Sequence, residues 1–194
     1  MDAKSFTDAI RSAASRITGK SRISEPTQVR AMGQFVRTEY KSLDVAIPDS
    51  FLTSPPSQPV VAKHIDWASS PLPEYEGRTA VVLDNVLSPE ECTELLTLAE
   101  FSVPKEDGAS PWRPALVNVG VGVETAAPGY RDSERIIWDQ QVIVDRVWER
   151  MAQAEGMREL LATCPDGASG EWRFQRLNER MRFLKYSPGQ FFKR

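Results

Sequence analysis

Prolines between Ile47 and Gly77 limit what this part of the chain can fold into. Six of them, at positions 48, 55, 56, 59, 71 and 73, are mixed with serines. A proline lacks a backbone N–H and restricts φ, so a long helix cannot form across this stretch. We therefore predict an extended connector at residues 47–78. It separates an N-terminal region, residues 1–46, from a domain at residues 79–194.

The N-terminal region carries apolar residues at helical spacing. Examples are Val29, Met32, Val36 and Tyr40. Gly19 interrupts the pattern, and Pro26 suits the first turn of a new helix. We predict two modest helices between residues 5 and 43.

The composition is typical of a globular protein with one core, with 41% hydrophobic and 26% charged residues in a chain of 194. The net charge is -3, and Lys and Arg are scattered along the sequence. No basic face is expected, and therefore no nucleic-acid partner. No apolar run approaches the roughly 20 residues needed to cross a bilayer, and the N-terminus lacks the apolar core of a secretory signal. We expect no membrane association and an intracellular location, cytoplasmic or nuclear.

The first 20 residues leave a mitochondrial location open. Arg11, Arg16 and Lys20 lie opposite apolar residues, as in a transit helix, although Asp2 and Asp8 argue against one. Common catalytic motifs are absent: the sequence has no G-x-S-x-G and no P-loop. Cys92 and Cys164 belong to no C-x-x-C pair, so buried or unreactive thiols are expected.

The domain opens with a strand followed by a well-marked helix start. Residues 79–87 are rich in β-branched side chains and predict the strand. Ser88 can cap the helix, Pro89 fits its first position, and Glu91 can close a capping box. Four residues recur at helical spacing and predict the buried face of this helix: Cys92, Leu95, Leu96 and Ala99.

Further along, residues 116–123 alternate valine with small or polar residues, which predicts one half-buried strand. Asp139 is expected to cap a second helix that continues until Gly156. The pattern of residues 171–187 then predicts two strands. Pro188 and Gly189 suit the middle of a type II turn, after which Phe191 and Phe192 should begin another strand.

Three segments together resemble a known enzyme family: VVLDNVLSPEECTELLTLAE, YRDSERIIWDQQVIVDRVWERM and LNERMRFLKYSPGQFF. They resemble the 2-oxoglutarate- and Fe(II)-dependent dioxygenases of the prolyl 4-hydroxylase-like family. The third segment has the family form N-x-R-x-R-x-x-x-Y-x-x-G-Q-x-F, which in the family precedes H-x-D. The resemblance covers residues 79–194. It implies an α+β fold, with N-terminal helices followed by the first helices and strands of a truncated double-stranded β-helix, or jelly roll.

In the family, two histidines and one carboxylate bind the iron and leave positions open for 2-oxoglutarate and O2. This chain has one histidine, His64, which lies in the connector and is expected to be exposed to solvent. The sequence ends where H-x-D is due, so the resemblance implies an incomplete domain, inactive as this chain stands. We predict no catalytic residue, no metal ligand and no cofactor for this chain. Fe(II), 2-oxoglutarate and ascorbate are implied for the full-length family.

By resemblance, Tyr186 matches the tyrosine whose hydroxyl binds 2-oxoglutarate; the alternative is a core tyrosine with a satisfied hydroxyl. Arg182 is a second candidate for 2-oxoglutarate, because it lies four residues earlier on the same strand face. For Arg180 and Arg182, a paired or solvated role in the sheet competes with that reading. The resemblance places Arg131 and Arg135 in a substrate loop, with exposed surface charge as the default.

A non-catalytic interaction protein is the alternative function. An open sheet edge at Phe191 and Phe192 would accept a strand from another chain. The partner would be a complementing paralogue, or a second copy through self-association. An enzyme of unrelated mechanism is a third reading, with no motif in its favour.

Overall fold

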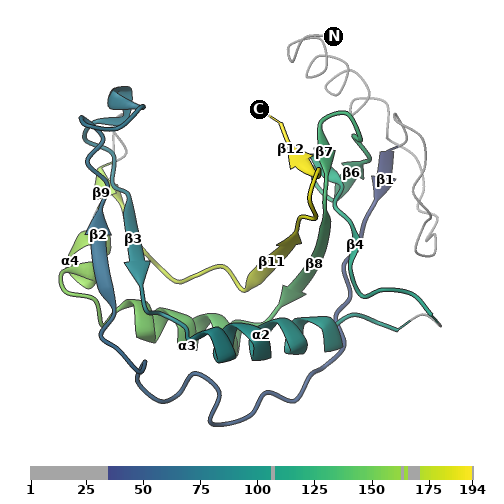
Figure 1. The fold of residues 1–194 in the computed structure, drawn as a ribbon, viewed down its shortest axis with the longest axis horizontal. Helices are drawn as coiled ribbons and strands as arrows, with labels where there is room; N and C mark the ends of the chain where they lie inside the picture. Colours follow the sequence, from purple (N-terminus) through teal and green to yellow (C-terminus); the bar gives the residue numbers. More distant parts are fainter. Residues whose placement is uncertain (1–34, 106–107, 163, 166–170, 194) are drawn as a thin grey trace. The chain divides into compact units, whose positions relative to one another are not determined.

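The computed structural model describes residues 35–105, 108–162, 164–165 and 171–193 (Figure 1). The helices predicted before residue 35 lie outside these ranges. The chain divides into two compact units. Unit 1 takes the residues up to Leu43, Val103–Ile137 and the residues from Arg182, and unit 2 takes Asp44–Ser102 and Trp138–Met181. The fold is mixed, with few helices and several small antiparallel sheets, and none of the described sheets closes on itself.

Unit 1 consists mainly of short strands. They are β1 (Phe35–Arg37), β4 (Arg113–Pro114), β5 (Val117–Gly120), β6 (Val123–Thr125), β7 (Arg131–Asp132) and β12 (Phe191–Phe192). One sheet has the order β1-β6-β5, and β12 pairs with β7, beside which it lies in Figure 1. The prediction of a strand at Phe191 and Phe192 is therefore confirmed.

Residues 117–125 form a hairpin, so the prediction of one strand through Val123 was wrong. β5 pairs antiparallel with β6, and Val121 and Gly122 form the turn between them. Gly122 has φ 66°, a left-handed conformation that glycine adopts without strain. Val121 is 98% exposed instead of lying on a buried face. The period-two pattern misled because it continues unbroken across a two-residue turn.

β1 corrects the end of the predicted N-terminal helices. Phe35 pairs with Thr125 and Arg37 with Val123, so this segment is an edge strand of the hairpin sheet. Tyr40 follows in irregular structure. The helical spacing was wrong here because pairing with β6 overrides a weak local preference.

Two longer strands complete the described sheets. β8 (Glu134–Asp139) and β11 (Arg180–Lys185) lie in a sheet of order β11-β8-β4. Arg135, Ile136 and Trp138 of β8 are all buried. β10 (Glu171–Trp172) pairs with β9 (Cys164–Pro165), so the two strands predicted after residue 170 are both present, as β10 and β11.

Unit 2 holds the helices. Its further elements are β2 (Val61–His64), the 3-10 helix η1 (Pro73–Tyr75), β3 (Val81–Asp84), α2 (Pro89–Phe101), α3 (Gln141–Met151) and α4 (Met157–Ala162). β2 and β3 run antiparallel (Figure 1). The proline-rich stretch contains no long helix, as predicted, but it contributes buried Phe51 and Leu52. Val60 packs with Ala154 and Met157 in a small apolar cluster.

The start of α2 is confirmed in full. Ser88 Oγ accepts the Glu91 N–H at 3.2 Å, and the Glu91 carboxylate accepts the Ser88 N–H at 2.8 Å. The predicted buried face was wrong in part, because Cys92 and Leu96 are exposed, whereas Leu98 and Ala99 are buried. The helix therefore turns Glu91 rather than Cys92 toward its packing partners.

The start of α3 differs from the prediction. Gln140 caps this helix through its side chain, which accepts the Val142 N–H at 3.2 Å. Asp139 ends β8 instead. α3 stops at Met151, and Gly156 lies just before α4, a helix that was not predicted. No helix in the described ranges is long and apolar enough to cross a membrane.

Candidate functional site

The segment that resembles the dioxygenases folds as strand, turn and strand. β11 ends at Lys185, and the Gln190 N–H donates to the Ser187 carbonyl at 2.9 Å to close the turn. Gly189 has φ 91°, close to the value that a type II turn requires at its third position. The turn was therefore predicted correctly from Pro188 and Gly189.

Tyr186 and Arg182 are both exposed. The Tyr186 side chain is 44% exposed, so it is not the core tyrosine of the alternative reading. Neither side chain has a hydrogen bond or ion pair with any residue in the described part of the chain. Arg180 differs, because its Nε and Nη2 donate to the Asp139 carboxylate at 2.7 and 2.6 Å. Arg180 thus has a structural partner, and Tyr186 and Arg182 keep free donors.

Aromatic and cationic side chains alternate near this turn in unit 1. The Arg131 guanidinium lies 4.8 Å from the centre of the Phe192 ring, and the Tyr130 ring meets the same ring edge-on at 5.3 Å. Lys193 lies over the Phe191 ring at 4.7 Å. Phe192 is 54% exposed. Each of the two phenylalanine rings thus has one cation beside it, and the exposed Phe192 ring leaves apolar surface open to a ligand.

A buried charge network supports the hairpin of unit 1. Arg135 Nη2 donates to Glu124 Oε2 at 2.5 Å, and both side chains are nearly fully buried. Tyr40 bridges the pair, because its hydroxyl donates to Glu124 and accepts from Arg135. Thr38 donates a further hydrogen bond to Glu124 at 3.1 Å. The default of exposed charge was therefore wrong for Arg135, whose partners are distant in sequence.

The network also fixes the protonation state of Tyr40. Burial, together with the hydrogen bond to the Glu124 carboxylate, raises the pKa of the Tyr40 hydroxyl to about 12. The hydroxyl therefore stays neutral up to strongly alkaline pH and acts as a bridge rather than as a base. Every charge in this network has a partner, so its role is structural.

The described residues do not fit the iron site of the family. His64 lies exposed on β2 and is the single histidine of the chain. Among the residues that the structure describes, no group of three or more His, Cys, Asp or Glu side chains could hold a metal ion. Two imidazoles and a carboxylate cannot be assembled from this sequence.

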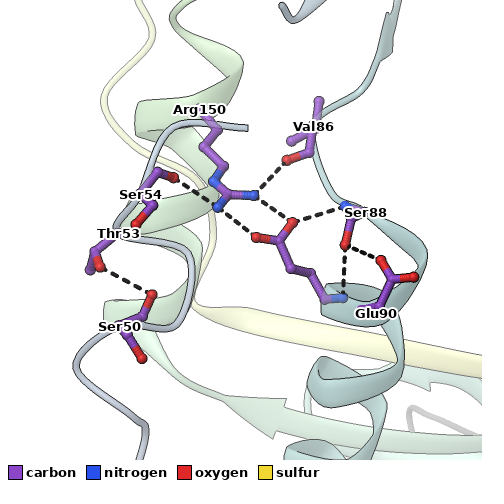
Figure 2. A network of polar contacts seen from close by, with 8 residues as sticks. Ser50, Thr53, Ser54, Val86, Ser88, Glu90 and Arg150 are labelled. Atoms are coloured by element: carbon purple, nitrogen blue, oxygen red, sulfur yellow. Dashed lines mark hydrogen bonds and ion pairs between the residues drawn. The ribbon is translucent and has the colours of Figure 1, made fainter. Parts of the chain in front are cut away.

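A second polar network lies in unit 2, at the start of α2 (Figure 2). The Arg150 guanidinium, itself buried, donates to the carbonyls of Ser54 and Val86 at 2.8 and 3.1 Å. It also donates twice to the Glu91 carboxylate, at 2.7 Å each. These bonds hold the capping carboxylate of α2 in place, which makes this network structural as well.

A small open pocket of about 160 Å³ lies next to this network, lined by residues 56–58, Asn85 and residues 87–89. Two of its polar side chains have other roles, because the Asn85 amide donates to the Pro59 carbonyl and Ser88 caps α2. The lining contains no ionisable side chain, so it supplies no general acid or base.

No protein-family model, no curated protein and no solved structure matches the chain. The functional argument therefore depends on the motif and on the geometry of its residues. Of the predicted site residues, Tyr186 and Arg182 lie on the same exposed segment of unit 1. The exposed aromatic and cationic residues beside β12 were missed, because their proximity arises from pairing of β12 with β7.

Proposed function

We propose that this chain is the N-terminal part of a 2-oxoglutarate- and Fe(II)-dependent dioxygenase of the prolyl 4-hydroxylase-like family. The complete enzyme would hydroxylate a protein or small-molecule substrate. One observation carries the proposal: the segment of residues 178–192 matches the family form and folds as a strand, a type II turn and a second strand. Within the jelly roll that we propose, these would be two of the early strands.

The small core of unit 1 supports this proposal. Among the described residues, its buried apolar side chains are Ala115, Ala127 and Ile136. Its buried polar and charged residues are more numerous: Glu124, Thr125, Ser133 and Arg135. A sheet normally packs its apolar face against a second layer. Further strands, as in a double-stranded β-helix, would supply that layer.

Because the residues present do not fit an iron site, we propose that the chain has no turnover by itself. Fe(II), 2-oxoglutarate and ascorbate belong to the complete domain. The part that this chain would play there is positioning. Tyr186 would offer its hydroxyl, and Arg182 its guanidinium, to the carboxylates of 2-oxoglutarate, which suits two donors that have no other partner among the described residues.

The proposal is tested with two proteins. The 194-residue chain should contain no stoichiometric iron and should release no succinate from 2-oxoglutarate. A chain extended in frame through an H-x-D motif and a later histidine should do both. In that longer protein, Tyr186→Phe should raise the KM for 2-oxoglutarate by about tenfold, since a hydrogen bond to a charged group contributes about 1.5 kcal/mol. Robust succinate release by the short chain would contradict the proposal.

An interaction protein is the second candidate function. The free edge of β12, with the exposed Phe192 side chain, favours it. An unpaired strand edge is a template for another strand. The partner would be an intact paralogue that restores the site, or a second copy of this chain. Co-purification of the chain with the paralogue, lost when β12 is altered, would support this function.

A further inference from the structure

The backbone of β12 has one side that faces away from its sheet. The Lys193 N–H donates to the Tyr130 carbonyl at 2.9 Å, and in the same register Phe192 lies opposite Arg131. Hydrogen-bonded and non-hydrogen-bonded pairs alternate along an antiparallel ladder. Because Lys193 and Tyr130 are a hydrogen-bonded pair, Phe192 and Arg131 are not. The N–H and C=O of Phe192 therefore point away from β7.

This outer side is free within the described part of the chain. β7 is the single strand that pairs with β12 there. Arg131 turns its N–H to the Ala127 carbonyl, at 2.7 Å, so β7 satisfies its own outer donor. The Phe192 N–H has no acceptor among the described residues. One donor and one acceptor thus flank an exposed aromatic side chain.

The charged residues of unit 1 carry a net positive charge, although Asp132 lies opposite Phe191. The described residues of unit 1 contain nine Lys and Arg but four Asp and Glu. All four acids already have partners, and Glu39 lies 3.9 Å from Lys41. Glu124 pairs with buried Arg135, Glu134 lies 3.6 Å from Lys185, and Asp132 accepts from Gln190. The surplus is therefore positive, and Arg131 and Lys193 place it beside Phe191 and Phe192.

This charge selects among possible occupants of the edge. A second copy pairing β12 with β12 would bring two Lys193 and two Arg131 side chains together, which is unfavourable. A partner strand with carboxylates would instead meet opposite charge. We propose that the outer edge of β12 binds an extended, acidic segment of a partner protein by strand addition. This proposal rests on the interaction function given above.

In this complex the partner backbone accepts the Phe192 N–H and donates to the Phe192 carbonyl. An apolar residue of the segment lies against the Phe192 ring. The Asp or Glu next to it faces Lys193 on the other face of the sheet, and one two residues away lies on the same face as Arg131. The bond pattern is that of β-augmentation, in which the backbone provides affinity and the side chains provide specificity.

Three labelled peptides of about seven residues, the length of an ordinary strand, test the proposal on the purified 194-residue chain. All have Val-Thr-Val in the middle, and their ends carry Asp and Glu, Gln, or Lys. Fluorescence anisotropy should show the tightest binding for the acidic peptide. The Gln peptide should bind about fivefold more weakly or worse, the Lys peptide should not bind, and salt should weaken the acidic complex.

Two variants distinguish the contribution of the Phe192 side chain to binding from that of its backbone N–H. Phe192→Ala keeps the outward N–H and loses the ring, whereas Phe192→Pro removes that N–H without touching the bonds to β7. The Pro variant should bind about fivefold more weakly than the Ala variant, because it loses one backbone hydrogen bond. Lys193→Ala should also weaken binding. Lys41→Ala, which removes an exposed cation of unit 1 paired with Glu39, should not. Circular dichroism checks that each variant is folded.

Each other outcome has a definite meaning. Equal binding of the three peptides would overturn the acidic specificity while the interaction function remains. No binding of any peptide would overturn both. Self-association that depends on concentration and is lost in Phe192→Pro would make a second copy the occupant and overturn the proposal. None of these results bears on iron content or succinate release, so the dioxygenase proposal is tested separately.

Discussion

Arg150 on α3 and Glu91 on α2 form a two-point ion pair: Nη1 lies 2.7 Å from Oε2, and Nη2 lies 2.7 Å from Oε1. The same carboxylate accepts the Ser88 N–H, so the capping box of α2 and the contact between two helices share one group. Arg150 also binds the carbonyls of Ser54 and Val86. One guanidinium therefore joins four parts of unit 2.

Arg150→Ala should lower the free energy of unfolding by about 3 kcal/mol, since it removes the four hydrogen bonds that a buried guanidinium makes to Glu91 and to the carbonyls of Ser54 and Val86. Arg158→Ala is the matched control, because the Arg158–Glu149 pair is exposed and should contribute at most about 0.5 kcal/mol. Urea unfolding followed by tryptophan fluorescence measures both. Equal losses for the two variants would show that Arg150 has no special role.

Acid should weaken unit 2 through Glu91. The hydrogen bond from Arg150 lowers the pKa of the Glu91 carboxyl, with help from the Ser88 N–H. Its stabilising effect is therefore complete above the ordinary value of 4.5 and is lost as pH falls from there toward the lower folded pKa. The urea concentration at the midpoint of unfolding, measured from pH 7 to strongly acidic pH, should decrease within that pH window. Glu91→Gln should be less stable at neutral pH and should show a shallower acid dependence.

Tyr40 should make unit 1 sensitive to strong alkali. Its folded pKa is about 12, against 10.0 for the free side chain. The neutral form is favoured by folding, so this stability is complete below pH 10 and is lost as pH rises through about 12. Ultraviolet titration should find one late tyrosine that disappears in Tyr40→Phe.

The matched control for that titration is Tyr186→Phe, which removes an exposed hydroxyl without a hydrogen-bond partner among the described residues. It should leave the late tyrosine in place and the free energy of unfolding at pH 7 unchanged. A late tyrosine that persists in Tyr40→Phe would contradict the bridged geometry of Tyr40, Glu124 and Arg135.

Sequence patterns whose residues lie within four positions of one another predicted the local structure correctly. Ser88, Pro89 and Glu91 specify the start of α2, and Pro188 with Gly189 specifies the turn before β12. In each case the interacting groups are close in sequence, so no knowledge of the fold is needed. His64 is exposed, as expected from its place in the proline-rich connector.

Long-range partners could not be predicted. Arg135 looks like surface charge until Tyr40, 95 residues away, and Glu124 surround it. The buried face of α2 was displaced for the same reason, because Glu91 faces an arginine 59 residues later. A pattern of apolar residues does not include such ion pairs.

The exposure of Cys92 is a consequence of the displaced buried face of α2. Cys92 was expected to be buried or unreactive, but it is exposed on α2. We expect the native protein to react with a thiol reagent such as DTNB at Cys92 without denaturant, since exposure gives the reagent access. Cys92→Ser should remove the rapid phase. A native protein that reacts only after unfolding would contradict the rotated face of α2.

The most direct test of the dioxygenase proposal is to sequence the transcript beyond the codon for Arg194. The proposal predicts that the frame stays open and reaches His-x-Asp within a few codons, with a further histidine later. That result would place Tyr186 and the turn at residues 187–190 just before the first iron ligand. A stop codon directly after Arg194 would contradict it and would favour the interaction function of β12.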